Sequence, residues 1–349
     1  MFELPDLTLM LGQLRSGLTT AMFLFLIASG LSLIFGVLKI INFAHGSLYM
    51  IGAYTAWHIV HYMVGNGLAG FAFAVLVAAT IVGIVGGLIE RLLLRHMYHR
   101  EELYQLLFTY ALVLVFADAC KYIWGTQPVS VQRPELLAGY MTLFNVRLPY
   151  YDSLIIIIGL LIAGGFWLML NRTAFGRIIR AAALDREMLG ALGTNVSWLY
   201  TSMFILASFL AGLSGALVTP IKGIAPGLDV DIIIEVFIVV VIGGLGSVFG
   251  TLYGSLAYGI TLAFGILIQP RFSIVAAFIL MAVVLVIRPW CRSQNAALAY
   301  GVPVTFGFLF LMLGTPIGII GGVATILICA GLIAAPHVTR SMTARGRSA

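Results

Sequence analysis

The sequence predicts an all-α fold, a polytopic transmembrane helical bundle of about 8–11 spans. Hydrophobic residues make up 61% of the 349 residues and charged residues only 9%, whereas a soluble domain carries about a quarter charged residues. Apolar runs of roughly 20 residues recur along the chain, and each is long enough to cross a bilayer core of about 30 Å. The strands of a membrane barrel would instead alternate apolar and polar residues in short segments.

The apolar runs define the candidate spans in chain order. We place them at about 17–38, 44–63, 68–89, 103–124, 151–170, 198–219, 232–246, 249–268, 272–289, 296–313 and 316–335. The segment 232–246 is short for a full crossing. We expect a transmembrane core over residues 1–292, followed by a C-terminal extension, 293–349, that forms a transmembrane hairpin with a basic cytoplasmic tail.

The positive charges are unevenly divided between the two sides of the predicted bundle. The net charge is +6, from 19 Lys and Arg against 13 Asp and Glu. If every candidate span crosses, thirteen of the 19 cations share the side of the 171–197 loop and the C-terminus. Cytoplasmic loops carry an excess of Lys and Arg, so we expect the N-terminus outside and the C-terminus in the cytoplasm. The basic residues do not cluster with stacking aromatics, and we therefore expect no nucleic-acid partner.

A short polar segment interrupts the apolar pattern between the first two spans. The run Asn42-Phe-Ala-His-Gly46 follows one apolar helix and precedes another. Inside a bilayer the backbone leaves the helix only where protein or a water-filled cavity receives it, so the interruption indicates a transport path. The run Gly243–Gly250 is a second candidate break, and paired broken helices near the midplane are typical of transporter sites. Two separate tight turns are the alternative.

Polar side chains in and after the first break are the candidate substrate-path residues. They are Asn42, His45, Ser47 and Tyr49, and the helix-break glycines are Gly46, Gly243, Gly244 and Gly246. The imidazole of His45 either hydrogen-bonds to a substrate or satisfies carbonyl groups that the break leaves free. The ring of Tyr49 either lines the path or anchors its helix at the membrane interface.

The basic loop 171–197 is predicted to hold two short helices. Thr173 is a good capping residue, Phe175–Leu184 is rich in alanine, and Asp185 or Gly190 would end the first helix before a second short turn. Such a pair could insert an apolar ridge into a partner's groove while its charges set the orientation. The alternative is an interfacial helix whose arginines lie on lipid phosphates.

Motifs from about residue 10 to residue 292 follow one another in a definite order. They are Gly30-Leu-Ser-Leu-Ile-Phe-Gly36, Ile41 to Tyr54, Thr173-x-Phe-Gly-Arg177 with Arg180, Ala211-Gly-Leu-Ser-Gly215, Val241-Ile-Gly-Gly-Leu-Gly-Ser247 and Arg288-Pro289. The residues of these motifs and their order along the chain resemble those of the permease subunits of branched-chain amino-acid ABC importers. The chain departs from that pattern at Glu235, where a non-acidic residue is expected, and after Thr109, where a glycine is expected.

The resemblance implies the transmembrane permease subunit of an ABC importer, which works by alternating access in a bacterial inner membrane. The implied substrates are branched-chain amino acids, with leucine as a typical case, or related small polar solutes such as urea, amides and small carboxylates. The loop 171–197 would couple the chain to ATP-binding subunits. The residues that carry this role are Thr173, Gly176, Arg177, Arg180, Asp185, Arg186, Glu187 and Gly193.

The resemblance also implies the remaining partners. They are two ATP-binding subunits, a second homologous permease subunit that makes a heterodimer rather than a homodimer, and a periplasmic or lipid-anchored solute-binding protein, all working in or at the lipid bilayer. The chain has no Gly-x4-Gly-Lys-Ser/Thr phosphate loop. We therefore expect no cofactor in this chain, with ATP and magnesium bound by the partner subunits.

Two other function classes stay open from the residues alone. An ion-coupled secondary transporter of small solutes would need an intramembrane carboxylate, and Asp118 and Glu235 qualify, both near span ends. A membrane enzyme would need an acid, a base and a nucleophile that converge, and no span supplies them. We therefore expect no catalytic residue. Two pairs of histidines have helical spacing, His58 with His61 and His96 with His99. Neither pair has carboxylate or cysteine partners, so no metal site is expected.

Overall fold

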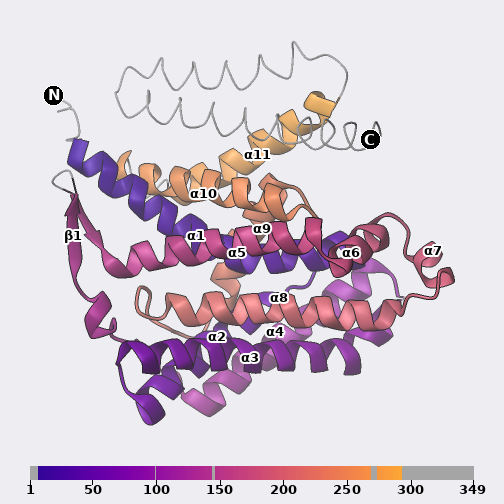
Figure 1. Ribbon diagram of the computed structural model, residues 1–349, viewed down its shortest axis with the longest axis horizontal. Helices are drawn as coiled ribbons and strands as arrows, with labels where there is room; N and C mark the ends of the chain where they lie inside the picture. Colours follow the sequence, from indigo (N-terminus) through magenta and orange to yellow (C-terminus); the bar gives the residue numbers. More distant parts are fainter. Residues whose placement is uncertain (1–6, 99, 144–145, 269–272, 293–349) are drawn as a thin grey trace.

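The computed structural model describes residues 7–98, 100–143, 146–268 and 273–292. Long helices run between two ends of the molecule, as Figure 1 shows. The strand β1 lies at one end, which we call the hairpin end, and the short helices α6 and α7 lie at the other, which we call the loop end. The expected C-terminal extension, with the spans 296–313 and 316–335, lies outside the described residues.

Within the described part of the chain each predicted span corresponds to a helix, although α1 begins at Leu7, ten residues before the predicted span 17–38. The long elements are α1 (Leu7–Leu38), α2 (Ala44–Ile59), α3 (Leu68–Leu92), α4 (Glu102–Trp124), α5 (Tyr150–Arg172), α8 (Val196–Val218), α9 (Leu228–Gly243), α10 (Val248–Ile268) and α11 (Ser273–Arg292). The short helices are α6 (Ala174–Leu184), α7 (Arg186–Ala191), η1 (Val60–Val64), η2 (Leu94–Met97) and η3 (Glu135–Leu137). The π-helical turn η1 continues α2, so that the two together match the predicted span 44–63.

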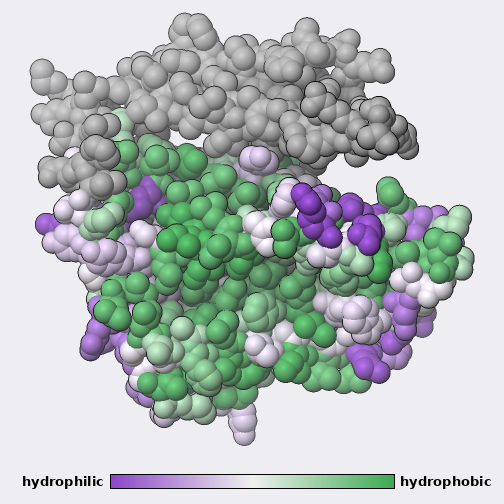
Figure 2. Space-filling model, viewed as in Figure 1, coloured by the Kyte–Doolittle hydropathy of each residue, from purple (hydrophilic) through white to green (hydrophobic). Residues whose placement is uncertain are grey.

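Six of the described helices are long and apolar enough to cross a membrane: α1, α3, α4, α5, α8 and α10. On the face shown in Figure 2, apolar residues form a broad band between the two ends, and hydrophilic residues gather toward the ends. The helices α2 and α9 have 16 residues each, which at 1.5 Å per residue gives about 24 Å. Each is therefore shorter than a bilayer core of about 30 Å.

The core lies around α8, which packs against α1, α2 and α3. Small residues allow these contacts: a Cβ atom at Gly30 would meet the backbone of Ala207, and one at Gly52 would meet Gly212. Close backbone approach through small residues is the usual way in which helices associate inside membranes. A buried hydrogen bond from Ser214 Oγ to the Phe23 carbonyl oxygen, 2.8 Å long, adds a polar link between α8 and α1.

The hairpin end contains a structure that the apolar pattern did not predict. The strands β1 (Tyr140–Leu143) and β2 (Val146–Pro149) pair antiparallel between α4 and α5. Nearby, Val129 and Ile224 form an isolated antiparallel bridge that ties the loop after α4 to the loop after α8. The loop 125–150 thus joins a second loop at this end of the bundle.

Gly215 gives the first testable prediction, because α2 crosses α8 at this residue. A Cβ atom there would overlap the Tyr49 carbonyl oxygen and lie 3.1 Å from the Ala53 nitrogen. We expect Gly215→Ala to lower the free energy of unfolding by about 1–3 kcal/mol, the usual cost of overpacking. Thermal unfolding of the purified protein in detergent measures the effect. Gly164→Ala, on α5 with nothing within 4 Å, is the matched control, and equal stability of both variants would contradict the prediction.

Candidate functional site

The chain leaves the helix where the sequence predicts a break. The helix α1 ends at Leu38, Lys39 adopts a φ of 58°, and α2 begins at Ala44. The break is stabilised by its own polar residues: Asn42 Oδ1 accepts from the Ala44 nitrogen at 3.1 Å, and His45 Nε2 lies 3.1 Å from the Ile27 carbonyl oxygen. His45 therefore contacts a carbonyl group in the middle of α1, not one of the carbonyl groups that the break leaves free.

The start of α2 meets the start of α9 inside the bundle. Ser47 Oγ donates to Asp229 Oδ2 at 3.1 Å, across 182 residues of sequence. A Cβ atom at Gly46 would overlap the Asp229 carbonyl oxygen and lie 3.0 Å from the Ile233 Cβ atom, so the two first turns touch through backbone. Two short helices thus begin at one point in the interior, an arrangement typical of transporter sites built from discontinuous helices.

The Gly243–Gly250 run forms a tight turn, which is one of its two predicted alternatives, rather than a break paired with Asn42–Gly46. The Asn42–Gly46 break meets α9 at Asp229 and Ile233. The glycine run forms a tight turn between α9 and α10, in which Gly244 and Gly246 have φ values of 97° and 85°. A Cβ atom at Gly243 would meet Gly250, and Gly246 packs against Gly36 of α1. These glycines serve close packing and positive φ at a turn.

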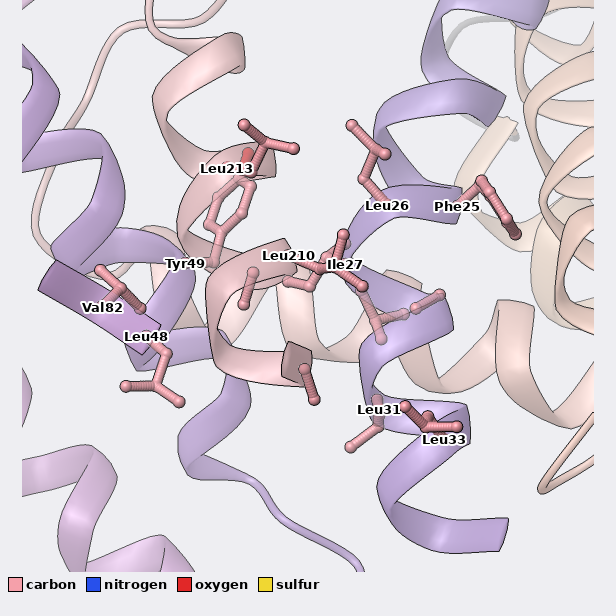
Figure 3. Close-up of a cluster of buried hydrophobic side chains, with 14 of the residues drawn as sticks. Phe25, Leu26, Ile27, Leu31, Leu33, Leu48, Tyr49, Val82, Leu210 and Leu213 are labelled. Carbon is pink, nitrogen blue, oxygen red and sulfur yellow. The ribbon is translucent and has the colours of Figure 1, made fainter. Parts of the chain in front are cut away.

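All four candidate path residues are buried in the interior of the chain. Asn42 is 1% exposed, and His45, Ser47 and Tyr49 are fully buried. Figure 3 places Tyr49 among apolar side chains that include Leu213, so Tyr49 does not anchor α2 at a membrane interface. Several polar atoms at this junction have no hydrogen-bond partner among the described residues. They are Asn42 Nδ2, His45 Nδ1, the hydroxyl groups of Tyr49 and Tyr54, and Asp229 Oδ1.

An aromatic and apolar layer separates this junction from the hairpin end. The rings of Tyr54 and Trp124 stack with centroids 5.3 Å apart. Cys120, Ile224 and Met50 pack in the same buried cluster. Met50, Tyr54 and Ile224 of this cluster are fully buried.

The loop 171–197 folds as the sequence predicts. Thr173 Oγ1 accepts from the Gly176 nitrogen at 3.1 Å and so caps α6. Asp185 ends α6 and caps α7 by accepting from the Glu187 and Met188 nitrogens at 3.0 Å each. A turn at Gly193, with a φ of 84°, leads into α8. The two helices are therefore locally determined by their caps.

The α6–α7 element is held against α5 at one end and exposed at the other. A Cβ atom at Gly176 would overlap the backbone of Met169 and Leu170, and Arg180 Nη1 donates to the Leu170 carbonyl oxygen. Beyond this anchor an apolar ridge faces outward: Leu184 is 89%, Met188 60% and Leu192 76% exposed. Arg177, Asp185, Arg186 and Glu187 are exposed as well. Figure 1 shows α7 projecting from the loop end. The element thus presents an apolar ridge among charges.

Asp118 and Glu235, the two carboxylates that an ion-coupled carrier could use, differ in burial and in their partners. Asp118 forms an exposed ion pair with Lys121, with Nζ and Oδ1 3.0 Å apart. Glu235 is partly buried and its Oε2 atom has no partner among the described residues. Asp229 is the acidic residue that sequence reasoning did not select. Its importance depends on a contact with Ser47 that no local pattern reveals.

Comparisons with known proteins give a consistent picture. The family model described as "Branched-chain amino acid transport system / permease component" matches residues 13–288. The high-affinity branched-chain amino acid transport system permease protein BraD of Pseudomonas aeruginosa is 30% identical over 301 residues, 82% of this chain and 96% of BraD. The corresponding permease protein LivH of Escherichia coli K12 is 26% identical over 292 residues, 80% of this chain and 94% of LivH.

A more distant similarity covers a smaller part of the chain. The fructose import permease protein FrcC of Rhizobium meliloti is 31% identical over 140 residues, which is 37% of this chain and 39% of FrcC. No solved structure matches the chain.

Proposed function

The chain belongs to the family of branched-chain amino acid transport permease components, and from this premise we propose that it translocates branched-chain amino acids by alternating access. Separate ATPase subunits drive the cycle, and a solute-binding protein delivers the substrate. Related small polar solutes remain within the proposal, because a partial relative is a fructose import permease. The permease relatives give no support to an ion-coupled carrier or to an enzyme.

The proposed assembly has two ATP-binding subunits and two permease subunits. We propose that the second permease subunit is a homologous chain rather than a copy of this one. ATP and magnesium bind to the ATPase subunits, and this chain carries no cofactor of its own. The protein is a multi-pass membrane protein, and the excess of positive charge at the loop end supports a cytoplasmic position for that end in a bacterial inner membrane.

The observation that carries the proposal is the α6–α7 element. Its apolar ridge, Leu184, Met188 and Leu192, is exposed among charged residues. Exposed apolar clusters mark interaction sites, so this ridge is the surface that we propose docks on the ATPase subunits. Capped helix ends and the anchor at Gly176 make the element rigid enough to transmit a displacement to α5 and α8. Closure of the ATPase pair moves this element, and the bundle opens outward and then inward.

Charge reversal in α6 tests this role of the loop. Arg177 is exposed and makes no ion pair with another described residue, so Arg177→Glu changes the surface without breaking an internal contact. We expect Arg177→Glu to reduce ATP-driven leucine uptake at least about tenfold, because a like-charge contact at an interface costs several kcal/mol, while the protein still inserts. Arg180→Glu also removes the hydrogen bond to the Leu170 carbonyl oxygen, and we expect it to reduce ATP-driven leucine uptake by as much or more.

The measurement is uptake into proteoliposomes together with the amount of inserted protein. Arg147→Glu, at the hairpin end where Arg147 lies over the Tyr140 ring, is the control and is expected to keep coupling between ATP hydrolysis and uptake. Normal uptake in both α6 variants would exclude the docking role.

A further inference from the structure

The carboxylate of Asp229 is buried without a countercharge among the described residues. Asp229 is 1% exposed, and neither ion pair found in the described part of the chain includes it. Its Oδ2 atom accepts from Ser47 Oγ, and its Oδ1 atom has no hydrogen-bond partner. An ionisable residue in this position within a membrane protein is expensive to bury and marks a functional site. Its free oxygen can accept one more donor.

Unpartnered donors lie on the helix that meets Asp229. Asn42 Nδ2 and the hydroxyl groups of Tyr49 and Tyr54 have no acceptor among the described residues, and all belong to α2 or to the break before it. Buried polar atoms in native proteins normally have partners, so three donor groups and one carboxylate oxygen are free to bind a ligand near this junction.

A zwitterion supplies both groups in one molecule. An ammonium group has only donors and pairs with a carboxylate, and a carboxylate group has only acceptors and pairs with amide and hydroxyl donors. Asp229 lies in the first turn of α9, whose partial positive charge favours the ionised form of its carboxylate. A neutral sugar or amide would supply no cationic group to pair with this carboxylate.

We infer that Asp229 and Ser47 bind the ammonium group of a zwitterionic amino acid during its passage, and that Asn42 offers its amide to the carboxylate group. The inference rests on the proposed function, whose substrate class it defines. The rings of Tyr54 and Trp124 stack beside this junction, and we expect outward opening to separate them.

The test measures leucine transported per ATP hydrolysed by the purified importer in proteoliposomes, with saturating solute-binding protein. Asp229→Asn keeps the size of the side chain and removes its charge. We expect the amount of leucine transported per ATP hydrolysed to fall at least about tenfold in this variant, because a hydrogen bond to a charged group is stronger than one between neutral groups. Stimulation of the ATPase by the binding protein should persist. Ser47→Ala is expected to lose about threefold. Asp229→Glu, which retains the charge, is expected to recover part of the loss.

Asp118→Asn is the matched control, because Asp118 carries the same group in an exposed pair with Lys121. If wild-type protein shows no ATP-dependent uptake, the proposed function fails, whatever the variants do. If wild-type uptake is ATP-dependent and Asp229→Asn matches Asp118→Asn, the ammonium site is wrong. Equal losses of uptake, ATPase activity and thermal stability in Asp229→Asn would show a structural role instead. If the loss of uptake in Asp229→Asn depended on sodium concentration or pH rather than on leucine concentration, Asp229 would bind sodium or a proton instead of the ammonium group, and the inference would be overturned.

Discussion

Replacing Leu184 and Met188 together by aspartate is expected to abolish ATP-driven uptake. Both side chains are more than half exposed on the α6–α7 element, and burial of each against a partner subunit contributes about 1.5–3 kcal/mol. Their combined loss weakens the contact by a factor of at least about 100, since each 1.4 kcal/mol is tenfold in affinity. The ATP-binding subunits should then no longer copurify with the chain.

The measurement is the ratio of ATP-binding subunit to permease after purification in mild detergent. Leu136→Asp is the control, because Leu136 is 72% exposed at the opposite end of the molecule. We expect Leu136→Asp to retain the ATP-binding subunits. Retention of those subunits by the double variant would show that another surface makes the contact.

Gly46→Ala is expected to stop transport from within the bundle. The added methyl group would overlap the Asp229 carbonyl oxygen and press on the Ile233 side chain, so the first turns of α2 and α9 must separate. Overpacking of this kind costs about 1–3 kcal/mol, and the separation also lengthens the hydrogen bond between Ser47 and Asp229. We expect uptake to fall at least about tenfold with the ATP-binding subunits still attached, because α6 packs chiefly on α5 and α1 rather than on α2 or α9.

Uptake and subunit content are measured on the same preparation. Gly165→Ala on α5, where a Cβ atom has nothing within 4 Å, is the control and is expected to transport normally. Full uptake by Gly46→Ala would mean that the junction of α2 and α9 does not take part in transport.

The elements that the sequence predicts are those with local causes. Apolar runs locate the long helices, and the capping residues Thr173 and Asp185 determine the two helices of the 171–197 loop. The break at Asn42–Gly46 is visible because polar residues interrupt an apolar run. Each of these features depends on neighbours within one or two helical turns.

The features that the sequence does not reveal are those that depend on distant contacts. The contact between Ser47 and Asp229 spans 182 residues, and nothing near either residue indicates it. The packing of Gly246 on Gly36 is a distant contact of the same kind, and the residues alone left open whether the Gly243–Gly250 run pairs with the first break or forms a separate turn. The β1–β2 hairpin was missed because its strands have four residues each, too few for a periodic pattern.

The central claim is that this chain works only as part of an ATP-driven importer, and purification of the chain from its native membrane in a mild detergent tests it most directly. We expect ATP-binding subunits to copurify in a fixed ratio, with ATPase activity that rises on addition of a liganded solute-binding protein. A chain that purifies alone and catalyses uptake in liposomes without ATP would contradict the claim.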